Sequence, residues 1–306
     1  MSQLFISASP HIRSKNTTTR VMLDVIIALM PAVVASFLLF GGRSLLLVAT
    51  SVATAVLAEF LFNLICKKEN TLYDLSAVVT GILLALNVPV SLPLWQIAVG
   101  SAFAIIAVKG LFGGIGQNFA NPAIAARIMM ILSFGGTMSV FHYPADTVAS
   151  ATPLAMISGG AERMLPDTLD LFLGRYAGCI GETCSLALIL GGVYLLIRKV
   201  ISWHTPVAFI GTVFVGSFIF SMPPVAEILT GGLLLGAIFM ATDYSTTPIT
   251  KSGKLIFGFG CGLITLLIRK WGSYPEGVSF AILFMNILTP YIEKWKVSKP
   301  LGGAKK

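Results

Sequence analysis

Ten apolar segments follow one another along the chain, separated by short stretches that carry charges, glycine or proline. They run approximately over residues 21–40, 44–65, 72–88, 92–110, 120–134, 182–197, 205–221, 225–241, 254–268 and 278–292. A helix needs about 20 apolar residues to cross the hydrocarbon core of a bilayer. Several of these segments are short or interrupted by Gly or Pro, which is tolerated where neighbouring protein satisfies the freed backbone groups. The pattern therefore predicts an all-α polytopic membrane protein with about ten transmembrane helices.

The composition excludes two other classes of protein. Hydrophobic residues make up 56% of the 306 positions and charged residues only 11%, whereas soluble domains carry about 25% charged residues. Intrinsic disorder requires low hydrophobicity and a high density of charge. A soluble globular domain and a disordered chain are therefore both excluded.

The distribution of basic residues predicts the orientation of the helices. The net charge of +8 would favour nucleic acid as the partner of a soluble chain, but membrane proteins hold excess Lys and Arg in cytoplasmic loops. With a cytoplasmic N-terminus, fifteen basic residues lie inside and five outside, and Arg127 falls within a span. We therefore expect no nucleic-acid partner, cytoplasmic segments at 1–20 and 293–306, and one long outer-face loop at 135–181.

The two halves of the chain resemble each other. The sequence T-G-I-L-L-A-L-N (80–87) is similar to T-G-G-L-L-L-G-A (230–237), and each is followed by a Pro-containing stretch and another apolar segment. The alternative is a chance similarity between Gly- and Leu-rich helices. Five spans in each half would give the halves opposite orientations, and such inverted repeats place binding sites near the middle of the membrane. The hypothesis assigns one repeat to 21–134 and the other to 182–292.

A short motif in the outer-face loop carries the most specific chemistry. The stretch D-T-V-A-S-A-T-P-L (146–154) surrounds one threonine with small residues. Taken alone, it is typical of a loop that enters a helix, with Thr152 as the N-cap and Pro153 at the first helical position. It also resembles D-x-x-[STA]-[GS]-A-T, the recognition site of the flavin transferase that joins FMN to threonine through a phosphoester. The commonest form of that site has S-G where this chain has A-S. The matching residues include Asp146, Ser150, Ala151 and Thr152.

Three further stretches resemble one protein family. They are P-H-I-R (10–13), G-G-I-G-Q-N-F-A-N-P-A-I-A-A-R-I (113–128) and F-M-A-T-D-Y-S-T-T-P (239–248). The resemblance covers nearly the whole chain and is to the membrane flavoproteins that include the D-type component of the Rnf complex and the B-type component of the sodium-pumping NADH:quinone reductase. The B type has a longer N-terminal region, and the roughly twenty residues before the first apolar segment resemble the D type.

This resemblance implies a fold, cofactors and partners. The implied fold is a urea-channel-like, five-plus-five inverted repeat in the inner membrane of a prokaryote. The implied cofactors are FMN attached covalently to Thr152 and a second, non-covalent flavin of the riboflavin type. The implied partners are the A, B, C, E and G components of the Rnf complex, the flavin transferase and membrane lipid. The chain would then pass electrons within a ferredoxin:NAD⁺ oxidoreductase coupled to Na⁺ or H⁺ transport, without a complete active site of its own.

Polar residues near two interruptions of the apolar segments are candidate ligands of the second flavin. The interruptions lie at 87–89 and 242–244, where half-helices would offer unpaired backbone groups. Glycine before the fifth segment would allow a flat ring to approach the backbone closely, and Asn121-Pro122 is a typical helix start. The candidates are Asn118, Asn121, Arg127, Thr242 and Asp243.

Several charged residues have more than one interpretation from the sequence. A charge within a span is a functional candidate, and Arg127 could face the phosphate or ring oxygens of a flavin. It could equally pair with a carboxylate such as Glu59 or Asp74, or with a carbonyl at a helix C-terminus. Asp243 could hold a flavin or cap the next turn. Glu59 and Glu227 could serve ion passage or pair with a basic residue.

Two alternative functions also remain open. One is a B-type component of a Na⁺-pumping NADH:quinone reductase, and the other is a non-redox channel or transporter for a solute. The motif at 146–152 favours a flavoprotein, because a transporter has no need of a flavinylation sequence. No cysteine spacing matches a metal site or iron–sulfur cluster. Cys179 and Cys184 could form a disulfide, but we expect free thiols because the second cysteine begins a helix.

Overall fold

Helices are the regular elements of this protein. The computed structural model describes residues 17–68, 71–144, 149–160, 165–272 and 276–295, and within these ranges β structure is limited to one bridge between His142 and Ala149. The prediction of an all-α fold is confirmed.

The first half of the chain contains five of the predicted apolar segments. Their helices are α1 (Thr18–Phe40), α2 (Gly42–Ile65), η1 (Leu72–Asp74) with α3 (Ser76–Leu86), α4 (Leu94–Phe103) with its π-helical extension η2 (Ala104–Gly110), and α5 (Pro122–Ser133). Asn121 caps α5, since its side-chain oxygen accepts from the amide of Ala123 at 3.0 Å. The predicted start of this helix at Asn121-Pro122 is therefore confirmed.

The second half contains the other five segments. Their helices are α9 (Ser185–Ile197), α10 (His204–Ile219), α11 (Pro224–Leu229) with α12 (Leu233–Leu235) and the π-helix η4 (Gly236–Met240), α13 (Lys251–Trp271), and α14 (Val278–Trp295). The long loop between the halves carries three short helices, α6 (Gly135–Met138), α7 (Pro153–Ser158) and α8 (Thr168–Leu173).

Only some of the helices are long enough to cross a bilayer on their own. Among the described residues, α1, α2 and α13 have the length and apolar composition of a membrane span. Five shorter apolar helices accompany them, namely α3, α4 with η2, α5, α9 and α10. This pattern is that of a multi-pass membrane protein.

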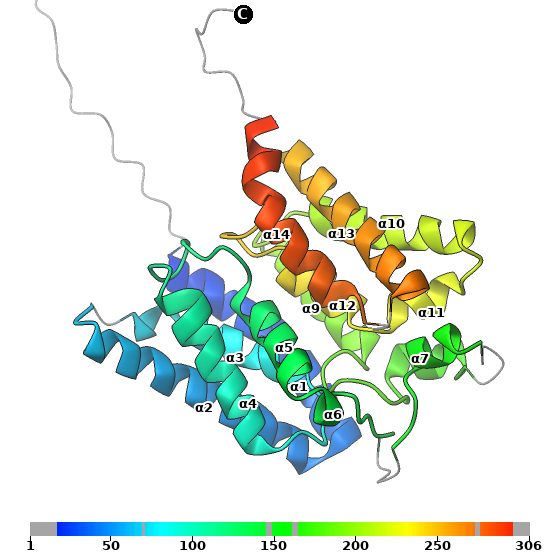
Figure 1. Ribbon diagram of the computed structural model, residues 1–306, viewed down its shortest axis with the longest axis horizontal. Helices are drawn as coiled ribbons and strands as arrows, with labels where there is room; N and C mark the ends of the chain where they lie inside the picture. The colour runs from blue at the N-terminus through cyan, green and yellow to red at the C-terminus, as the bar shows by residue number, and fades with distance from the viewer. Residues whose placement is uncertain (1–16, 69–70, 145–148, 161–164, 273–275, 296–306) are drawn as a thin grey trace, which may run out of the picture.

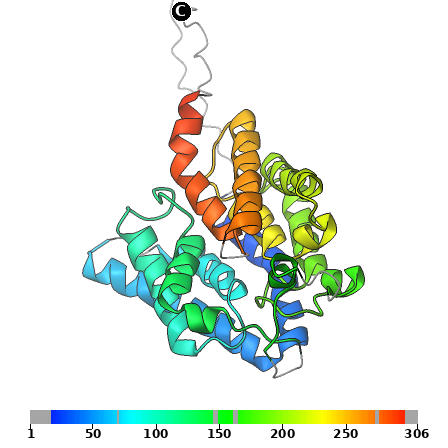
Figure 2. The same ribbon diagram turned by 45° about the vertical axis from the view of Figure 1, so that its right-hand side comes forward.

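The two halves form adjacent groups of helices (Figure 1). The blue-to-green helices α1–α6 lie on one side and the yellow-green-to-red helices α9–α14 on the other. The groups meet where α1 packs against α9 and α5 packs against α14. The view turned by 45° shows the same two groups side by side (Figure 2).

Packing within one half corresponds to packing within the other. In the first half α2 contacts both α3 and α4, and in the second half α10 contacts both α11 and α13. These are the second, third and fourth apolar segments of each half. Such a correspondence is what a repeat would produce, although the repeat boundaries at 21–134 and 182–292 stay a prediction.

The eighth apolar segment has a break that we did not predict. Both predicted interruptions coincide with helix ends, since α3 ends at Leu86 and η4 ends at Met240. In addition, α11 stops at Leu229, and Gly231 and Gly232 then have φ angles of +67° and +68°. Glycine adopts this left-handed conformation without the steric cost that a Cβ imposes, so the chain can turn here before α12.

A buried arginine stabilises that break. Arg269, in the last turn of α13, pairs with the Glu227 carboxylate at 2.6 Å and donates to the Thr230 carbonyl at 3.1 Å. These bonds satisfy carbonyls that the interrupted helix leaves without intrahelical partners. Of the two interpretations of Glu227, the pairing with a basic residue is what the structure shows.

A buried lysine has the corresponding place in the first half. Lys109, at the end of η2, contacts Glu59 at 2.6 Å and the Ser76 hydroxyl at 2.5 Å, at the point where η1 gives way to α3. The charge distribution counts Lys109, within the apolar segment 92–110, among the fifteen basic residues of the cytoplasmic side, and in the structure this residue is only 4% exposed. Glu59 is therefore also paired with a base.

Candidate functional site

Thr152 begins helix α7. Its hydroxyl oxygen accepts from the amide of Ala155 at 3.2 Å, and Pro153 occupies the first turn. The helix-capping interpretation of the motif is therefore confirmed. Capping uses a lone pair of the oxygen and leaves the oxygen in place for other chemistry. Asp146, the first residue of the motif, lies outside the described residues.

The residues of the motif border a cavity of about 290 Å³. Ser150, Ala151 and Thr152 line it together with Glu276, which precedes α14, and Phe280 in the first turn of α14. Small-molecule sites are concave and largely apolar, with a few polar groups, and measure about 300–1,000 Å³. Thr152 therefore lines a cavity of a size close to that of small-molecule sites, as a flavin attached to this residue would require.

Arg127 is linked to this cavity through Glu276 and lies apart from the other candidate ligands. Its guanidinium pairs with Glu276, and it also donates to Asn87 Oδ1 at 2.9 Å and to Ser279 Oγ at 3.0 Å. The partners we considered, Glu59 and Asp74, are wrong. Glu59 pairs with Lys109 instead, and Asp74 accepts from the amide of Ser76. The true partner comes from the other half of the chain, which a local pattern does not reveal.

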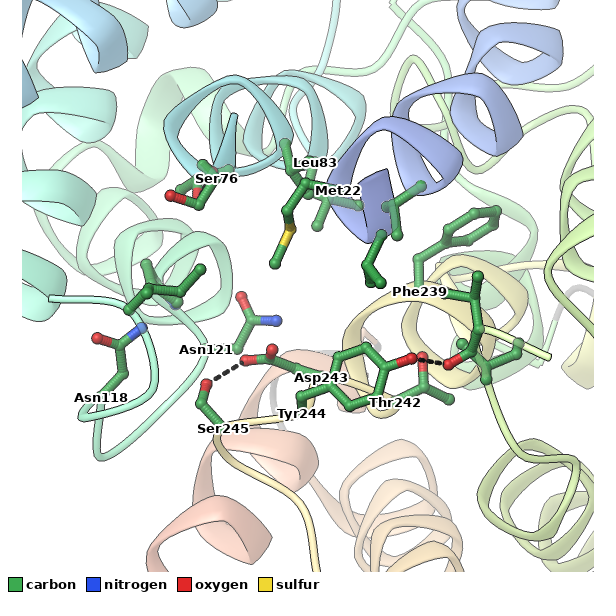
Figure 3. A pocket seen from close by; sticks show the side chains of 18 of the residues that line it. Met22, Ser76, Leu83, Asn118, Asn121, Phe239, Thr242, Asp243, Tyr244 and Ser245 are labelled. Carbon is green, nitrogen blue, oxygen red and sulfur yellow. Dashed lines mark hydrogen bonds between the residues drawn. The ribbon is translucent and has the colours of Figure 1, made fainter. Parts of the chain in front are cut away.

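The remaining candidate ligands of the second flavin line another cavity (Figure 3). Asn118, Asn121, Thr242 and Asp243 all border a space of about 90 Å³ that adjoins a wider groove of about 780 Å³. Segments 118–121 and 242–243, which lie far apart in sequence, thus meet between the two halves. Arg127 is not among the residues that line it.

The polar groups of this second cavity are partly satisfied by their own neighbours. Asp243 accepts from the hydroxyls of Ser245 at 3.0 Å and Thr246 at 3.2 Å, so it does cap the following turn. Burial raises the pKa of Asp243, and these hydrogen bonds oppose that shift. Asn118 Oδ1 is buried without a hydrogen-bond partner. An orphaned acceptor of this kind is costly unless a ligand or water supplies a donor, which fits a polar ligand in the cavity.

Three residues of interest were not singled out from the sequence. Glu276, Glu182 and Lys109 are all buried or nearly so. Glu182 and Lys109 stand within apolar segments, and that signal could have marked them, but Glu276 resembles an ordinary loop residue at the end of a span. Cys179 and Cys184 are free thiols, as we expected.

Comparison with known proteins places the chain in a family. Residues 5–302 match the sequence profile of the NQR2, RnfD, RnfE family. The chain belongs to this family.

Relatives of the NQR2, RnfD, RnfE family are similar over nearly their whole length. The chain is 46% identical over 306 residues to the D component of the Na⁺-translocating ferredoxin:NAD⁺ oxidoreductase complex of Acetobacterium woodii, covering 99% of this chain and 96% of the relative. It is 38% identical to the proton-translocating counterpart of Clostridium ljungdahlii, covering 95% and 93%. It is also 33% identical to the D component of the ion-translocating oxidoreductase complex of Aliivibrio salmonicida, covering 98% and 99%.

Proposed function

We propose that the chain is the flavin-carrying D component of an ion-translocating ferredoxin:NAD⁺ oxidoreductase, the Rnf complex, in the prokaryotic inner membrane. FMN is attached through a phosphoester to Thr152, and a second flavin occupies the cavity around Asp243. The partners are the A, B, C, E and G components of the same complex, with a flavin transferase for maturation. The observation that supports this most directly is that Thr152 lines a cavity, within a motif that resembles the transferase recognition site.

The residues that line the cavity have separate proposed roles. A bound flavin would supply the ability to accept and donate electrons singly or in pairs. Ser150 and Ala151 are small, which leaves room for a transferase and for a phosphate beside Thr152. Phe141 and Phe280 provide aromatic surface for a ring, and Glu276 with Arg127 provides charge that bears on its potential.

The experiment that tests this function is fluorescence of the denatured protein. The chain is expressed with the flavin transferase, denatured, washed with acid and separated on a gel. We expect a band that fluoresces under ultraviolet light at the mass of the chain, and no such band without the transferase. A non-fluorescent band in the presence of active transferase would contradict the proposal and favour a channel or transporter.

The second flavin site predicts an effect of Asp243→Ala on extractable flavin. Losing one hydrogen bond to a buried polar group costs about 1–3 kcal/mol, which is about a 5- to 150-fold loss of affinity. We expect less non-covalent flavin in acid extracts of the assembled complex, with the covalent flavin unchanged. Asp170→Ala, which removes an exposed carboxylate elsewhere, is the control. Equal extractable flavin in wild type and Asp243→Ala would show that Asp243 only caps its turn.

The proposed topology predicts which thiols an impermeant reagent reaches. Ser158 is exposed at the end of α7 and Cys66 is exposed at the end of α2. The distribution of basic residues puts them on opposite faces, with both termini cytoplasmic and the loop 135–181 outside.

Two chains, both lacking the partly exposed Cys184, make the comparison. Ser158→Cys combined with Cys66→Ser should be labelled in intact spheroplasts, whereas the chain that keeps Cys66 and Ser158 should be labelled only after lysis. The buried Cys179 and Cys261 remain in both chains. The opposite result would reverse the topology and put the FMN on the cytoplasmic face.

A further inference from the structure

Glu182 is a buried carboxylate that the proposed flavin sites do not use. It lies between α8 and α9, where the chain runs along the end of α3, with Ile180 donating to the Val88 carbonyl at 3.0 Å and Gly181 to the Leu86 carbonyl at 2.9 Å. Only 3% of the residue is exposed. Backbone pairing just before this residue therefore holds its carboxylate inside the protein.

One oxygen of this carboxylate has no partner. Oε1 of Glu182 accepts from the amide of Cys179 at 3.0 Å, whereas Oε2 is buried and makes no hydrogen bond. Among the described residues Glu182 has no ion pair. Leaving an ionised oxygen in this state is energetically costly, because burial removes its hydration without replacing it.

The nearest titratable groups form a compact cluster. The sulfur of Cys179 and carboxylate oxygens of Glu182 and Glu276 lie within 4.8 Å of one another. The one cation that the described residues place at this cluster, Arg127, is already bound to Glu276. The cluster therefore has two carboxylates and one guanidinium, and because that guanidinium is bound to Glu276, Glu182 lacks a counter-charge.

More distant charges do not restore the balance. The other cation that acts on Glu182 is Arg269, which is paired with Glu227 at 2.6 Å. Counting both pairs, three carboxylates face two guanidinium groups. The described titratable and charged groups around Glu182 are Arg127 of α5, Tyr176, Cys179 and Cys184 of the loop before α9, Glu227 of α11, Arg269 of α13, and Glu276 before α14.

We propose that Glu182 is a proton-binding site, at which one proton is exchanged on the unpartnered oxygen Oε2. A proton neutralises the excess negative charge of the cluster and removes the cost of a buried unpaired carboxylate. The other members of the cluster, Cys179 and Glu276, are the titratable groups nearest to the resulting O–H group.

The geometry favours a proton over a metal cation. A Cβ atom on Gly232 would lie 2.8 Å from Glu182 Oε2 and 3.7 Å from Arg127 Nη1. The space beside Oε2 is therefore bordered by a guanidinium, which repels a metal ion strongly at low dielectric. A proton on the carboxylate itself needs no such space.

The site also has a direct connection to the cavity beside Thr152. Glu276 belongs to the cluster and at the same time lines that cavity. This step rests on the proposed function. If the complex delivered one electron to a flavin there, the added negative charge would favour transfer of one proton from a hydronium ion to Glu182 Oε2. An O–H bond of the hydronium ion then breaks, an O–H bond forms on Glu182, and one water molecule is released. The proton affinity of Glu182 therefore rises when the flavin is reduced.

Infrared difference spectroscopy of the assembled complex in membranes tests the proton site without requiring a flavin. On a change of pH, we expect the C=O stretch of a neutral carboxylic acid, shifted by H/D exchange, and its loss in Glu182→Gln. Glu59→Gln is the matched control, because Glu59 is also 3% exposed with an unpartnered oxygen but has Lys109 at 2.6 Å. The control should keep the band.

Three results would overturn the proton site. They are a band that survives in Glu182→Gln, a band that disappears in Glu59→Gln instead, and a band that Na⁺ abolishes at constant pH. If Glu182→Gln does not assemble, Glu182→Asp keeps a carboxyl group in an altered position. The band should then shift, and an unshifted band would count against the assignment.

The same spectra recorded with oxidised and reduced complex test the connection to the cavity. We expect the pH at which the band is half developed to move upward on reduction, and this shift to vanish in Thr152→Ala while the band itself remains. An equal midpoint in both states of a flavinylated wild type would overturn the connection. A wild type with the Glu182 band but no covalent flavin would refute the proposed function alone.

Discussion

Thr152→Ala should remove all covalently bound flavin from the chain. The threonine hydroxyl oxygen is the atom that forms the proposed phosphoester, and alanine has no atom that can replace it. Loss of the N-cap of α7 costs about 0.5–2 kcal/mol. This loss affects one helix of six residues and leaves the packing of the long helices unchanged. The variant should therefore be inserted in the membrane in normal amounts but show no fluorescence on a denaturing gel.

Two neighbouring variants make this result specific. Ser150→Ala removes another hydroxyl of the same cavity and should keep the fluorescence. Thr152→Ser keeps an oxygen at the attachment position and an N-cap, so this variant should retain at least part of the fluorescence. Fluorescence that persists in Thr152→Ala, or that is lost in Ser150→Ala alone, would move the attachment site away from Thr152.

Arg269→Ala should produce the largest loss of stability among single substitutions at the ion pairs. The side chains of Arg269 and Glu227 are each 1% exposed, and removing one partner of a buried pair costs about 3–5 kcal/mol. The substitution also leaves the Thr230 carbonyl at the break of the eighth segment without its donor. We expect a clear drop in the thermal unfolding midpoint of the detergent-purified protein.

The matched control for this prediction is Arg175→Ala. Arg175 and Asp170 form an ion pair at 3.8 Å whose side chains are 68% and 41% exposed, and such surface pairs contribute about 0–1 kcal/mol. Its unfolding midpoint should stay close to that of wild type. Similar midpoints for the two variants would mean that Arg269 is not needed to hold α11 and α12 in place.

Local features of this protein could be predicted because local residues cause them. The helix start at Asn121 depends on a side chain that caps the amide two residues later, and the start of α7 depends in the same way on Thr152 and the proline after it. Apolar segments become helices because backbone groups in lipid must be satisfied within the segment. The ten segments and both predicted interruptions therefore agree with helices and helix ends in the structure.

Contacts between the halves could not be predicted in this way. Arg127 and Glu276 are 149 positions apart, and only the packing of α5 against α14 brings them together. From the sequence, Glu59 and Asp74 were equally plausible partners, because charge alone does not identify which carboxylate lies within reach. The break at Thr230–Gly232 is similar, since two glycines permit a turn there but a buried arginine from α13 satisfies its carbonyls.

The two candidate sites likewise depend in part on local sequence and in part on contacts between distant segments. The helical class and the membrane character followed from the sequence pattern, as did the motif around Thr152 that resembles a flavinylation site and the candidate residues for a second ligand. That 118–121 and 242–243 share a cavity, and that Glu182 lacks a counter-charge, followed only from the packing of distant segments. The reason is that capping and membrane insertion act over a few residues or one segment, whereas the charge balance of a buried group depends on every element that packs around it.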